Sequence, residues 1–276
     1  MSGKLENQNS VITGASEGIG KAIAERFLQE GAHVLITGRD AAKLDRAVRA
    51  LNKAVPDCGD RVKSYAADAC DAAQAEATIR TALESFGQID ILVNGVGRPF
   101  QKAASESGLK DFDRDFGLNL AAAVFHIEAV MPSMKRRRSG VVVNISSVAD
   151  SIPVPNCGFY SPAKAALVMY TRALASELGP YGIRVNSISP GPVDTAIFEK
   201  ILGGDASELK EGLRQLIPLQ RLGRAVDVAN AAAFLASQEA SWITGINLIV
   251  DGGRSVFSPA AKTYAAVNRE SSLADS

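Results

Sequence analysis

The sequence predicts an α/β fold with one mostly parallel, seven-stranded sheet that carries helices on both faces. Short apolar runs alternate with segments of helical periodicity along most of the 276 residues, which is typical of parallel strands joined by crossover helices. The apolar runs are continuous, as expected for strands buried on both faces. The sequence contains neither an internal repeat nor a linker. We therefore expect a single doubly wound domain, the arrangement called a Rossmann fold.

Each element can be placed by its apolar pattern. The predicted strands are Val11-Ile12, Val34 to Thr37, a third strand that ends at Tyr65-Ala66-Ala67, Ile89 to Val93, Val141 to Ile145, Ile183 to Ile188 and Ile246 to Val250. The predicted helices cover residues 18–30, 41–54, 71–86, 111–134, 160–178 and 226–236. The helix at 160–178 ends at Gly179-Pro180, because glycine followed by proline commonly stops a helix. We expect the domain to cover residues 1–257 and residues 258–276 to form a peripheral polar tail.

The charge of the chain is balanced. Lysine plus arginine equals aspartate plus glutamate at 30 residues each, so nothing points to nucleic acid or an anionic membrane surface as a partner. The one basic run, Lys135 to Arg138, is expected to be a solvated helix end that complements the helix dipole.

The cysteines and the N-terminus indicate where the protein works. Cys58, Cys70 and Cys157 are widely spaced and fit neither a metal site nor a disulfide framework. The first ten residues lack the apolar run of a signal peptide, and we expect no stretch to span a membrane. These features predict a cytoplasmic protein without a metal.

A glycine-rich turn follows the first predicted strand and leads into a helix. It reads Thr13-Gly-Ala-Ser-Glu-Gly-Ile-Gly20, with the spacing Gly-x-x-x-Gly-x-Gly. Glycines permit a tight turn and let backbone amides approach a pyrophosphate at the helix N-terminus. An ordinary strand-to-helix turn is the alternative, but the position between strand and helix favours dinucleotide binding. The candidate cofactor contacts in this turn are Gly14, Ser16, Glu17, Gly18, Ile19 and Gly20.

The residue after the second strand bears on the choice between NAD and NADP. An acidic side chain there would accept from the ribose 2′-hydroxyl of NAD and repel the 2′-phosphate of NADP. The position holds Gly38, followed by Arg39, whose guanidinium suits a phosphate. Glu17 places a negative charge near the same pocket and argues for NAD, and Arg39 has a solvated turn as its alternative role. We expect NADP(H), with NAD(H) as the alternative.

Polar and small residues end the next three strands, at the edge where open α/β sheets bind ligands. Asp68, followed by Ala69, could accept from the adenine amino group, with a surface carboxylate at a helix start as the alternative. Asn94 to Gly97 ends the fourth strand, where small residues let the cofactor approach. Ser146-Ser147 ends the fifth strand, and one hydroxyl there could stabilise developing oxyanion charge on a substrate.

Tyr160 and Lys164 lie four residues apart and therefore share one face of a helix. A free tyrosine has a pKa near 10 and is a poor acid–base catalyst at neutral pH. A nearby ammonium stabilises phenolate, so we expect Lys164 to lower the pKa of Tyr160. Taken alone, such a pair arises by chance on many solvated helices. Asn119 lies in an apolar helical stretch and must find partners, either in a core network or in the site.

After the sixth strand, Ser189 to Thr195 is expected to form a rigid turn. Residues 196–216 then make a connection of unusual length that includes Gly203-Gly204. We expect this stretch to be a substrate-binding loop or lid.

Taken in order, these motifs resemble the classical short-chain dehydrogenase/reductase family over about residues 5–257. The matching motifs are Thr-Gly-x-x-x-Gly-x-Gly at 13–20, Asp68, Asn94-x-x-Gly97, Asn119, the serine thirteen residues before Tyr160, Tyr160-x-x-x-Lys164 and Pro190-Gly191. The resemblance implies an oxidoreductase that transfers hydride between nicotinamide and a carbonyl or secondary alcohol.

The resemblance also implies a catalytic tetrad of Asn119, Ser147, Tyr160 and Lys164. In the family Tyr160 gives a proton to the carbonyl oxygen as nicotinamide delivers hydride, and the reverse in oxidation. Lys164 lowers the tyrosine pKa and binds the nicotinamide ribose, Ser147 rather than Ser146 holds the substrate oxygen, and Asn119 keeps a relay water. The further cofactor contacts are Asp68, Ala69, Asn94, Gly95, Tyr160, Lys164, Pro190, Gly191, Val193 and Thr195.

Two residues depart from the family pattern. The usual Asn-Asn-Ala-Gly has lost one asparagine at Gly95, which puts its hydrogen bonds in doubt. Glu17 occupies a position that is often basic in NADP-using members. Two other classes stay open: a catalytically inactive nucleotide-binding regulatory protein, and a related dehydratase or epimerase.

The resemblance implies a homotetramer, or a homodimer, paired through the helices near 111–134 and 160–178. The substrate pocket is expected between residues 98–101, 148–159 and 196–216. Its apolar residues suggest a 3-oxoacyl-, ketone- or steroid-like small molecule. Arg98 either pairs with a substrate carboxylate or faces water at the rim.

Overall fold

The computed structural model of the protein describes residues 3–195 and 207–256. Within them, the seven-stranded sheet has all neighbouring strands parallel, in the order β3-β2-β1-β4-β5-β6-β7. The strands are β1 (Asn9–Thr13), β2 (His33–Gly38), β3 (Val62–Ala66), β4 (Ile91–Asn94), β5 (Gly140–Ile145), β6 (Ile183–Pro190) and β7 (Asn247–Val250). The predicted doubly wound Rossmann fold is confirmed.

The strand order reverses at β1. The chain runs outward from β1 through β2 and β3, then crosses to β4 on the other side of β1 and continues outward to β7. Val11 in β1 accordingly has Leu35 of β2 on one side and Leu92 of β4 on the other. A crevice opens beyond the carboxyl ends of strands at such a reversal, and open α/β sheets bind ligands there. Thr13 and Asn94 are the last paired residues at this point.

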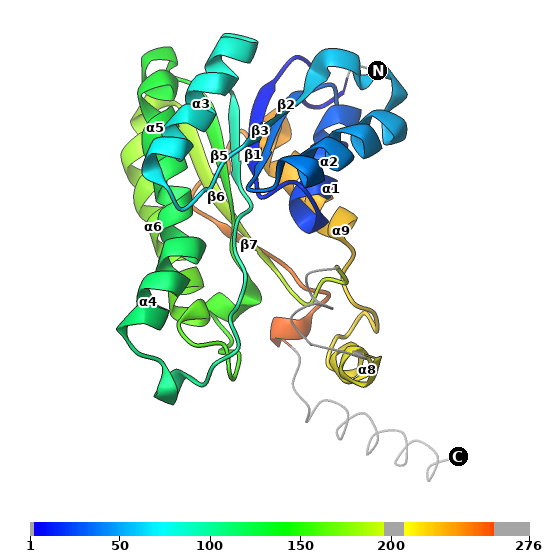
Figure 1. Ribbon diagram of the computed structural model, residues 1–276, viewed down its shortest axis with the longest axis vertical. Helices are drawn as coiled ribbons and strands as arrows, with labels where there is room; N and C mark the ends of the chain where they lie inside the picture. The colour runs from blue at the N-terminus through cyan, green and yellow to red at the C-terminus, as the bar shows by residue number, and fades with distance from the viewer. Residues whose placement is uncertain (1–2, 196–206, 257–276) are drawn as a thin grey trace, which may run out of the picture.

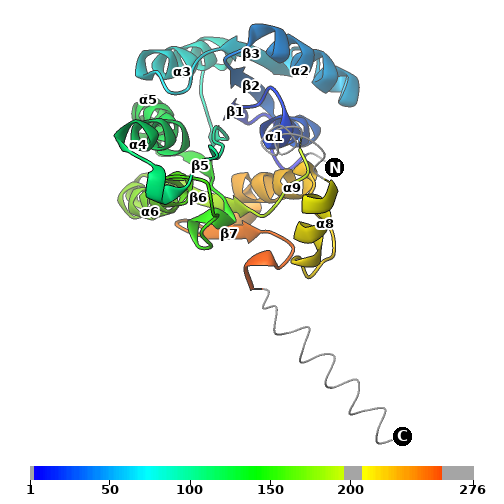
Figure 2. The ribbon, with the colours of Figure 1, turned by 60° about the horizontal axis from the view of Figure 1, so that its bottom comes forward.

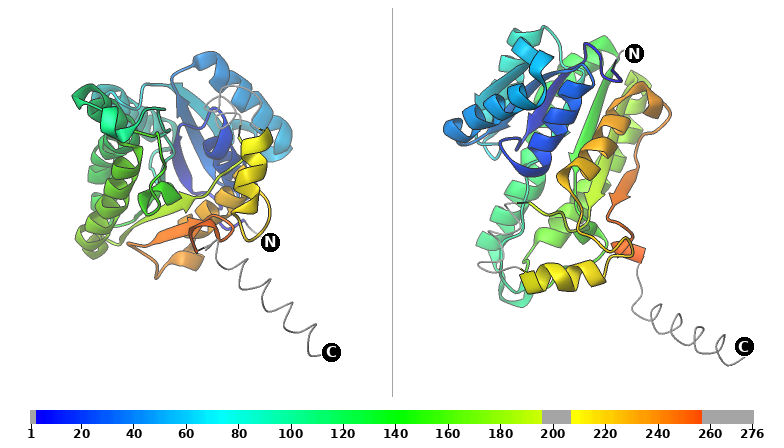
Figure 3. Two further views of the ribbon diagram at one scale, coloured as in Figure 1. Left: turned by 90° about the horizontal axis from the view of Figure 1, so that it is seen from below. Right: turned by 90° about the vertical axis from the view of Figure 1, so that its right-hand side faces the viewer.

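Helices cover both faces of the sheet (Figures 1 and 3). One face carries α1 (Gly18–Gln29), α2 (Ala41–Ala54) and α9 (Ala225–Ala236), and the other carries α3 (Ala72–Phe86), α5 (Ala122–Arg137) and α6 (Tyr160–Leu178). Two further helices, α4 (Leu109–Phe116) and α8 (Ser207–Gln215), lie at the end of the molecule where the strands end (Figures 1 and 2). Short 3-10 turns are η1 (Pro56–Arg61), η2 (Ala104–Glu106), η4 (Val148–Asp150), η5 (Gly179–Tyr181), η6 (Gln238–Ala240) and η7 (Arg254–Val256).

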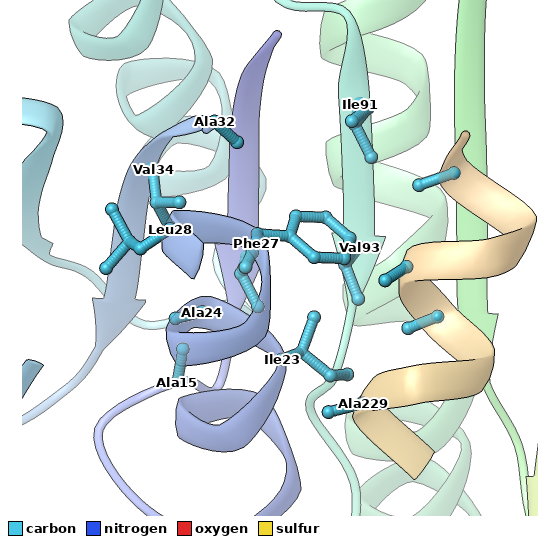
Figure 4. Packing of buried hydrophobic residues seen from close by; sticks show 14 of the residues in the cluster. Ala15, Ile23, Ala24, Phe27, Leu28, Ala32, Val34, Ile91, Val93 and Ala229 are labelled. Carbon is cyan, nitrogen blue, oxygen red and sulfur yellow. The ribbon is translucent and has the colours of Figure 1, made fainter. Parts of the chain in front are cut away.

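The core forms two apolar layers because successive strand residues face opposite sides of the sheet. Val11 belongs to the layer under α3, α5 and α6, whereas Ile12 belongs to the layer under α1 and α9. In the second layer the Phe27 ring of α1 extends toward Val93 of β4, with Ala229 of α9 close by (Figure 4). Phe27 is fully buried, and such burial stabilises the fold by roughly 2–3 kcal/mol. This packing fixes the helix that carries the glycine-rich turn.

The prediction of one continuous helix at 111–134 is wrong. The structure divides it into α4, a π-helical turn η3 (Gly117–Ala121) and α5. A π-turn inserts one extra residue into a helix and redirects its side chains, and such turns are frequent at functional sites. Asn119 lies within this turn and is buried.

The prediction that no stretch would meet the criteria for a membrane span is also wrong. By length and composition alone, the helical stretch Leu109–Arg137 is long and apolar enough to cross a membrane. Its buried residues, among them Ile127 and Val130, pack into the layer between the sheet and α3. The core helix of a soluble protein meets the same criteria.

Arg137 does not lie at a purely solvated helix end, as the basic run had suggested. Its Nη1 lies 2.8 Å from Oδ1 of Asp90, and its Nη2 donates to the carbonyl of Ile89. The long arginine side chain thus reaches from the end of α5 to the start of β4. Arg138 ends the helix in the left-handed conformation at φ 52° and donates to the carbonyl of Pro180.

Other boundaries differ by a few residues. β3 ends at Ala66 rather than at Ala67, and its edge position leaves several of its side chains exposed, which weakens the apolar pattern. Part of the predicted substrate loop, residues 207–215, forms the amphipathic helix α8. Residues 196–206 of that loop and the predicted tail at 258–276 lie outside the described residues.

Candidate active site

The glycine-rich turn connects β1 to α1 at the reversal of strand order. Gly14 and Gly18 have φ of 67° and 62°, a left-handed backbone conformation that favours glycine. A Cβ on Gly20 would lie 2.5 Å from the carbonyl oxygen of Gly14, so a side chain there would push α1 away from the turn. Glu17 precedes α1 and makes no side-chain hydrogen bond to its first turn. The amides of this turn therefore suit a phosphate group.

The Glu17 carboxylate has a partner that the sequence did not reveal. Nζ of Lys43, in the first turn of α2, lies 3.4 Å from Oε2 of Glu17. Both side chains are about one-third exposed. Arg39 follows β2 directly and is exposed. Two cations, Arg39 and Lys43, therefore follow β2, and Lys43 is paired with Glu17, the acidic residue that argued for NAD.

Asp68 and Arg39 both act on Cys70. An oxygen of the Asp68 carboxylate accepts from the Cys70 amide at 3.0 Å. Burial raises the pKa of the Cys70 thiol, Asp68 raises it further, and the Arg39 guanidinium lowers it. The two residues predicted for the adenosine end are thus close together, with Cys70 as an unpredicted third member. The neighbouring Ala69 is buried.

Asn94 points into the protein at the end of β4. Its Nδ2 donates to Oδ1 of Asn144 at 2.9 Å, and Nδ2 of Asn144 donates to Oγ1 of Thr171. Oδ1 of Asn94 is buried and has no hydrogen-bond partner among residues 3–195 and 207–256. Such an acceptor suits a donor group on a ligand.

Gly95 is explained by a close approach to the first strand. Its amide donates to Oγ1 of Thr13 at 3.1 Å, and a Cβ on Gly95 would lie 2.6 Å from the carbonyl oxygen of Thr13. The backbone amide of Gly95 therefore has a hydrogen-bond partner, although glycine stands where the family usually has a second asparagine. A side chain at this position would not fit against Thr13.

Asn119 is fixed by three hydrogen bonds. Its Oδ1 accepts from the amide of Arg98 at 2.9 Å, while its Nδ2 donates to the carbonyls of Arg98 and Asp115 at 3.1 and 3.0 Å. The segment after β4 therefore docks on the π-turn through this one side chain. A Cβ on Gly97 would lie 2.8 Å from Oδ1 of Asn119 and 2.7 Å from Nζ of Lys164. Gly97 thus allows the two polar groups to come together.

Lys164 is almost completely buried, with 2% of its surface exposed. Its Nζ donates to the carbonyl of Ile145 at 2.8 Å, at the end of β5. Burial lowers the pKa of Lys164 to about 8, and the negative charge of Asp150 opposes that shift. An amine with a pKa near 8 gains and loses its proton close to neutral pH, as a participant in acid–base chemistry requires.

Tyr160 begins α6 and is half-buried. Burial raises the pKa of Tyr160 to about 12, and a hydrogen bond with Ser147 acts in the opposite direction. Nζ of Lys164 lies 5.9 Å from the centre of the Tyr160 ring. The prediction that the pKa of Tyr160 lies below its usual value is wrong for this structure, because burial disfavours the phenolate and raises the pKa.

The two serines at the end of β5 face different partners. Oγ of Ser147 accepts from the amide of Ala149 at 3.2 Å, and its hydroxyl bonds with Tyr160. Ser146 is buried, and its Oγ lies 3.2 Å from the carbonyl oxygen of Lys164 and 3.3 Å from the Asp150 carboxylate. Ser147 is therefore the hydroxyl placed beside Tyr160, as the spacing had indicated.

Asp115 is a buried carboxylate that the sequence analysis missed. Its Oδ2 accepts from the amide of Phe159, the residue before Tyr160, at 2.9 Å. Its Oδ1 pairs with the guanidinium of Arg114 at 2.9 Å, and its carbonyl accepts from Asn119. Asp115 therefore ties the start of α6 to the π-turn. Its position one turn before Asn119 was the signal that could have identified it.

The turn after β6 returns to the glycine-rich turn. Pro190 ends the strand opposite Val250, and the amide of Gly191 donates to the carbonyl of Val250 at 3.0 Å. Val193 pairs with the segment at Gly223. The methyl of Thr195 lies 3.9 Å from the place that a Cβ on Gly18 would occupy.

The side chains of the two remaining predicted contacts in the glycine-rich turn, Ser16 and Ile19, pack against protein, which leaves their backbone amides as the groups for a cofactor. Ser16 lies under β2, where its Oγ is 3.4 Å from the position of a Cβ on Gly38, and Ile19 packs against the core.

An aromatic and cationic cluster lies outside the site. The guanidinium groups of Arg98 and Arg114 lie 4.5 and 4.1 Å from the centre of the Phe100 ring. Arg98 is exposed, as expected of a rim residue. Of the predicted apolar pocket wall, Ile152 and Phe159 are partly buried and Val154 is exposed. Ile197 and Phe198 lie outside the described residues.

The arrangement brings a phenol, a hydroxyl, a buried amine and an amide side chain to the carboxyl ends of β4 and β5. Within residues 3–195 and 207–256, no group of three or more His, Cys, Asp or Glu side chains could hold a metal ion. The phenol and the hydroxyl can hold a substrate oxygen, and the phenol can exchange a proton with it.

Comparison with known proteins is consistent with this geometry. Residues 14–255 match a family model described as Enoyl-(Acyl carrier protein) reductase. Dehydrogenase/reductase SDR family member 4 from Homo sapiens is 36% identical over 250 residues, which cover 90% of this chain and 88% of that protein. The 3beta-hydroxysteroid dehydrogenase 1 of Eggerthella lenta is 34% identical over 255 residues, which cover 92% and 95% of the two chains.

Solved structures agree with the fold. The crystal structure of levodione reductase superposes with a TM-score of 0.87 at 32% sequence identity, covering 91% of this chain and 99% of that chain. A likeness at this identity and coverage extends over the sheet, both helical layers and the strand ends that carry the site.

Proposed function

Because the chain belongs to the short-chain dehydrogenase/reductase family, we propose that it is an NADP(H)-dependent oxidoreductase with Tyr160 as its proton-transferring group. The reaction interconverts a carbonyl and a secondary alcohol. The observation that carries the proposal is the contact of Tyr160 with Ser147 beside the buried amine of Lys164. No other cluster in the described residues combines a phenol, a hydroxyl and an amine whose pKa is shifted toward neutrality.

The glycine-rich turn fits a dinucleotide. The close approach of Gly20 to Gly14 leaves a cradle that a Cβ would fill, and the first turn of α1 lacks a side-chain cap. The pyrophosphate would be held by Gly18 and Ile19, and the nicotinamide end by the segment from Pro190 to Thr195. When bound, the cofactor supplies the hydride donor or acceptor.

The chain's own residues would manage the proton and the substrate oxygen. Ser147 already accepts a hydrogen bond from the amide of Ala149, so its own proton is available to the substrate oxygen or to Tyr160. Tyr160 would donate its proton to that oxygen in reduction and remove it in oxidation. Lys164, as the ammonium, would stabilise the phenolate that remains.

The charges beyond β2 favour the 2′-phosphate of NADP. Arg39 is exposed at the position that follows the strand, and a guanidinium binds phosphate well. Glu17 would repel the phosphate, but Lys43 lies 3.4 Å from its carboxylate and offsets that charge. NAD is the alternative, for which the Glu17 carboxylate would accept from a ribose hydroxyl.

We propose that the protein works in the cytoplasm. We propose an alicyclic or otherwise apolar ketone as its substrate. The partly buried side chains of Ile152 and Phe159 offer apolar surface near Tyr160. The names of two relatives, a 3beta-hydroxysteroid dehydrogenase and a levodione reductase, point to ring ketones.

The proposal is tested by following nicotinamide absorbance with NADPH and with NADH against ring ketones, 3-oxoacyl thioesters and a 2-enoyl thioester. We expect oxidation of NADPH with a ring ketone, at a kcat/KM at least about tenfold above that with NADH. If the enoyl thioester is the one compound reduced, the protein reduces a carbon–carbon double bond rather than a carbonyl group. Binding of NADPH without any oxidation would indicate an inactive regulatory protein, and product formation without net cofactor consumption would indicate a dehydratase or epimerase.

We also propose a homotetramer that pairs through α4, α5 and α6. Apolar side chains are exposed on these helices, including Met169 at 60% and Phe112 at 40%, and burying them against a second copy would be favourable. Light scattering on the eluted protein should give a mass four times that of the chain. A mass twice that of the chain would indicate a homodimer instead, and a mass equal to that of the chain would exclude the proposal.

A further inference from the structure

The carboxylate of Asp150 lies at the centre of a polar network beside the active site. Asp150 is the last residue of the turn η4. Ser147 is the N-cap of this turn, and its side-chain oxygen accepts from the amide of Ala149. One of its oxygens, Oδ2, accepts from the hydroxyl of Ser189 and from Nδ2 of Asn247, the latter at 3.1 Å. The other oxygen accepts from the hydroxyl of Ser151 at 2.6 Å. Both oxygens of the carboxylate therefore accept hydrogen bonds.

This network joins the ends of three strands. Ser146 directly follows β5 and its Oγ lies 3.3 Å from Oδ2 of Asp150, Ser189 belongs to β6, and Asn247 begins β7. The network continues from Asn247, whose Oδ1 accepts from Ser187 at 2.9 Å and lies 2.8 Å from Oγ of Ser189. Ser146, Ser187 and Ser189 are buried. The turn that presents Ser147 is thus anchored to the sheet through one carboxylate.

The same carboxylate is the charged group that acts on both catalytic side chains of α6. Its charge raises the pKa of Lys164 against the effect of burial, and it also raises the pKa of Tyr160. The other groups that face Tyr160 are the Cys157 thiol, which raises the pKa, and the Ser147 hydroxyl, which lowers it. Asp115 is directed to the amide of Phe159 and acts on Cys157 instead.

We propose that Asp150 is a positioning residue of the active site: its carboxylate fixes the turn that presents Ser147 and acts by its charge on Tyr160 and Lys164. The inference rests on the proposed roles of those two side chains. The hydrogen bonds of the Asp150 carboxylate hold the turn that positions Ser147. Its negative charge favours the ammonium form of Lys164, and that ammonium stabilises a phenolate at Tyr160.

The test is the variant Asp150→Asn, which keeps the shape and removes the charge. The first readout is the pH titration of the Lys164 side chain by NMR of lysine-labelled protein, assigned with Lys164→Met. This measurement needs neither substrate nor turnover. The midpoint should fall by roughly 0.5–1 pH unit, because a neighbouring negative charge favours the ammonium. The pH profile of kcat/KM for the ketone reduced fastest should shift the same way, since Tyr160 also loses a negative neighbour.

Two controls separate charge from structure. Glu177→Gln removes the same charge from the exposed side of α6 and should leave both readouts unchanged. Ser189→Ala removes one hydrogen-bond donor to Asp150 and keeps the charge of Asp150. It should therefore lower kcat several-fold and leave the midpoint of the Lys164 titration unchanged.

The proposal is overturned if Asp150→Asn leaves the Lys164 midpoint unmoved, or if Glu177→Gln moves it equally. If Asp150→Asn does not fold, Asp150→Ser carries the same test. Absence of turnover in the wild-type protein would contradict the proposed function, whereas the titration would still decide the role of Asp150.

Discussion

Lys43 in the first turn of α2 lies with its Nζ 3.4 Å from the Glu17 carboxylate, and this contact joins α2 to the residue that precedes α1. The two side chains are about one-third exposed, so the pair contributes little to stability. Its effect is on local charge, because it offsets the acidic residue in the pocket where the adenine ribose is expected. Removing Lys43 should therefore change the choice of cofactor more than the stability of the fold.

The variant Lys43→Ala should raise the KM for NADPH by about tenfold and change the KM for NADH by no more than about twofold, since one charged contact is worth about 1–2 kcal/mol. Arg39→Ala should act in the same direction. Steady-state kinetics with both cofactors measures the difference. Lys53→Ala, an exposed lysine at the other end of α2, is the matched control. Equal losses with NADPH and NADH would contradict an interaction with the 2′-phosphate.

Gly97 leaves room for two polar side chains because it has no side chain of its own. In Gly97→Ala, the new Cβ would meet Nζ of Lys164 at 2.7 Å and Oδ1 of Asn119 at 2.8 Å. Lys164 is buried, so it must shift away from its bond to Ile145. We expect kcat to fall at least about tenfold, because small displacements of catalytic groups are costly.

Gly108→Ala is the control for this substitution, because a Cβ there meets nothing within 4 Å. Circular dichroism should show both variants folded. Wild-type kcat in folded Gly97→Ala would mean that the positions of Lys164 and Asn119 do not limit the reaction.

The burial of Lys164 costs stability. Its pKa falls from 10.5 to about 8, so below pH 8 the folded protein holds a buried ammonium that the unfolded chain holds in water. Between about pH 8 and 10.5 the folded state releases this proton before the unfolded state does, and the stability of the wild type rises with pH relative to a variant without the amine.

Lys164→Met should therefore be more stable than the wild type at pH 7, by roughly 1–3 kcal/mol, while losing activity. The difference should shrink as the pH rises through 8 toward 10. Urea unfolding at several pH values measures this trend. A stability difference independent of pH would show that the amine carries no burial penalty.

The strands and motifs could be predicted from local sequence. Strand ends such as Asn94 and Ser147 follow apolar runs, and the parallel sheet brings every carboxyl end to one edge. The order of these motifs along the chain therefore indicated the site before any contact was known.

Contacts between elements could not be predicted in this way. Lys43 meets Glu17 across 26 residues, and Asp150 meets Asn247 across 97 residues, so no local pattern links them. The π-turn at Asn119 interrupts a helix whose apolar spacing looks continuous in the sequence. The pKa of Tyr160 depends on burial by the whole surrounding fold, which its neighbour in the sequence does not reveal.

The most direct test of the account is the turnover of Tyr160→Phe, measured by NADPH absorbance beside the Kd for NADPH from fluorescence titration. The substitution removes one hydroxyl and keeps the ring. We predict that turnover falls by at least about 100-fold while Kd stays within about twofold, because general acid catalysis contributes roughly 10²–10⁴-fold. Turnover within a few-fold of the wild type would contradict proton transfer by Tyr160, and with it the proposed reaction.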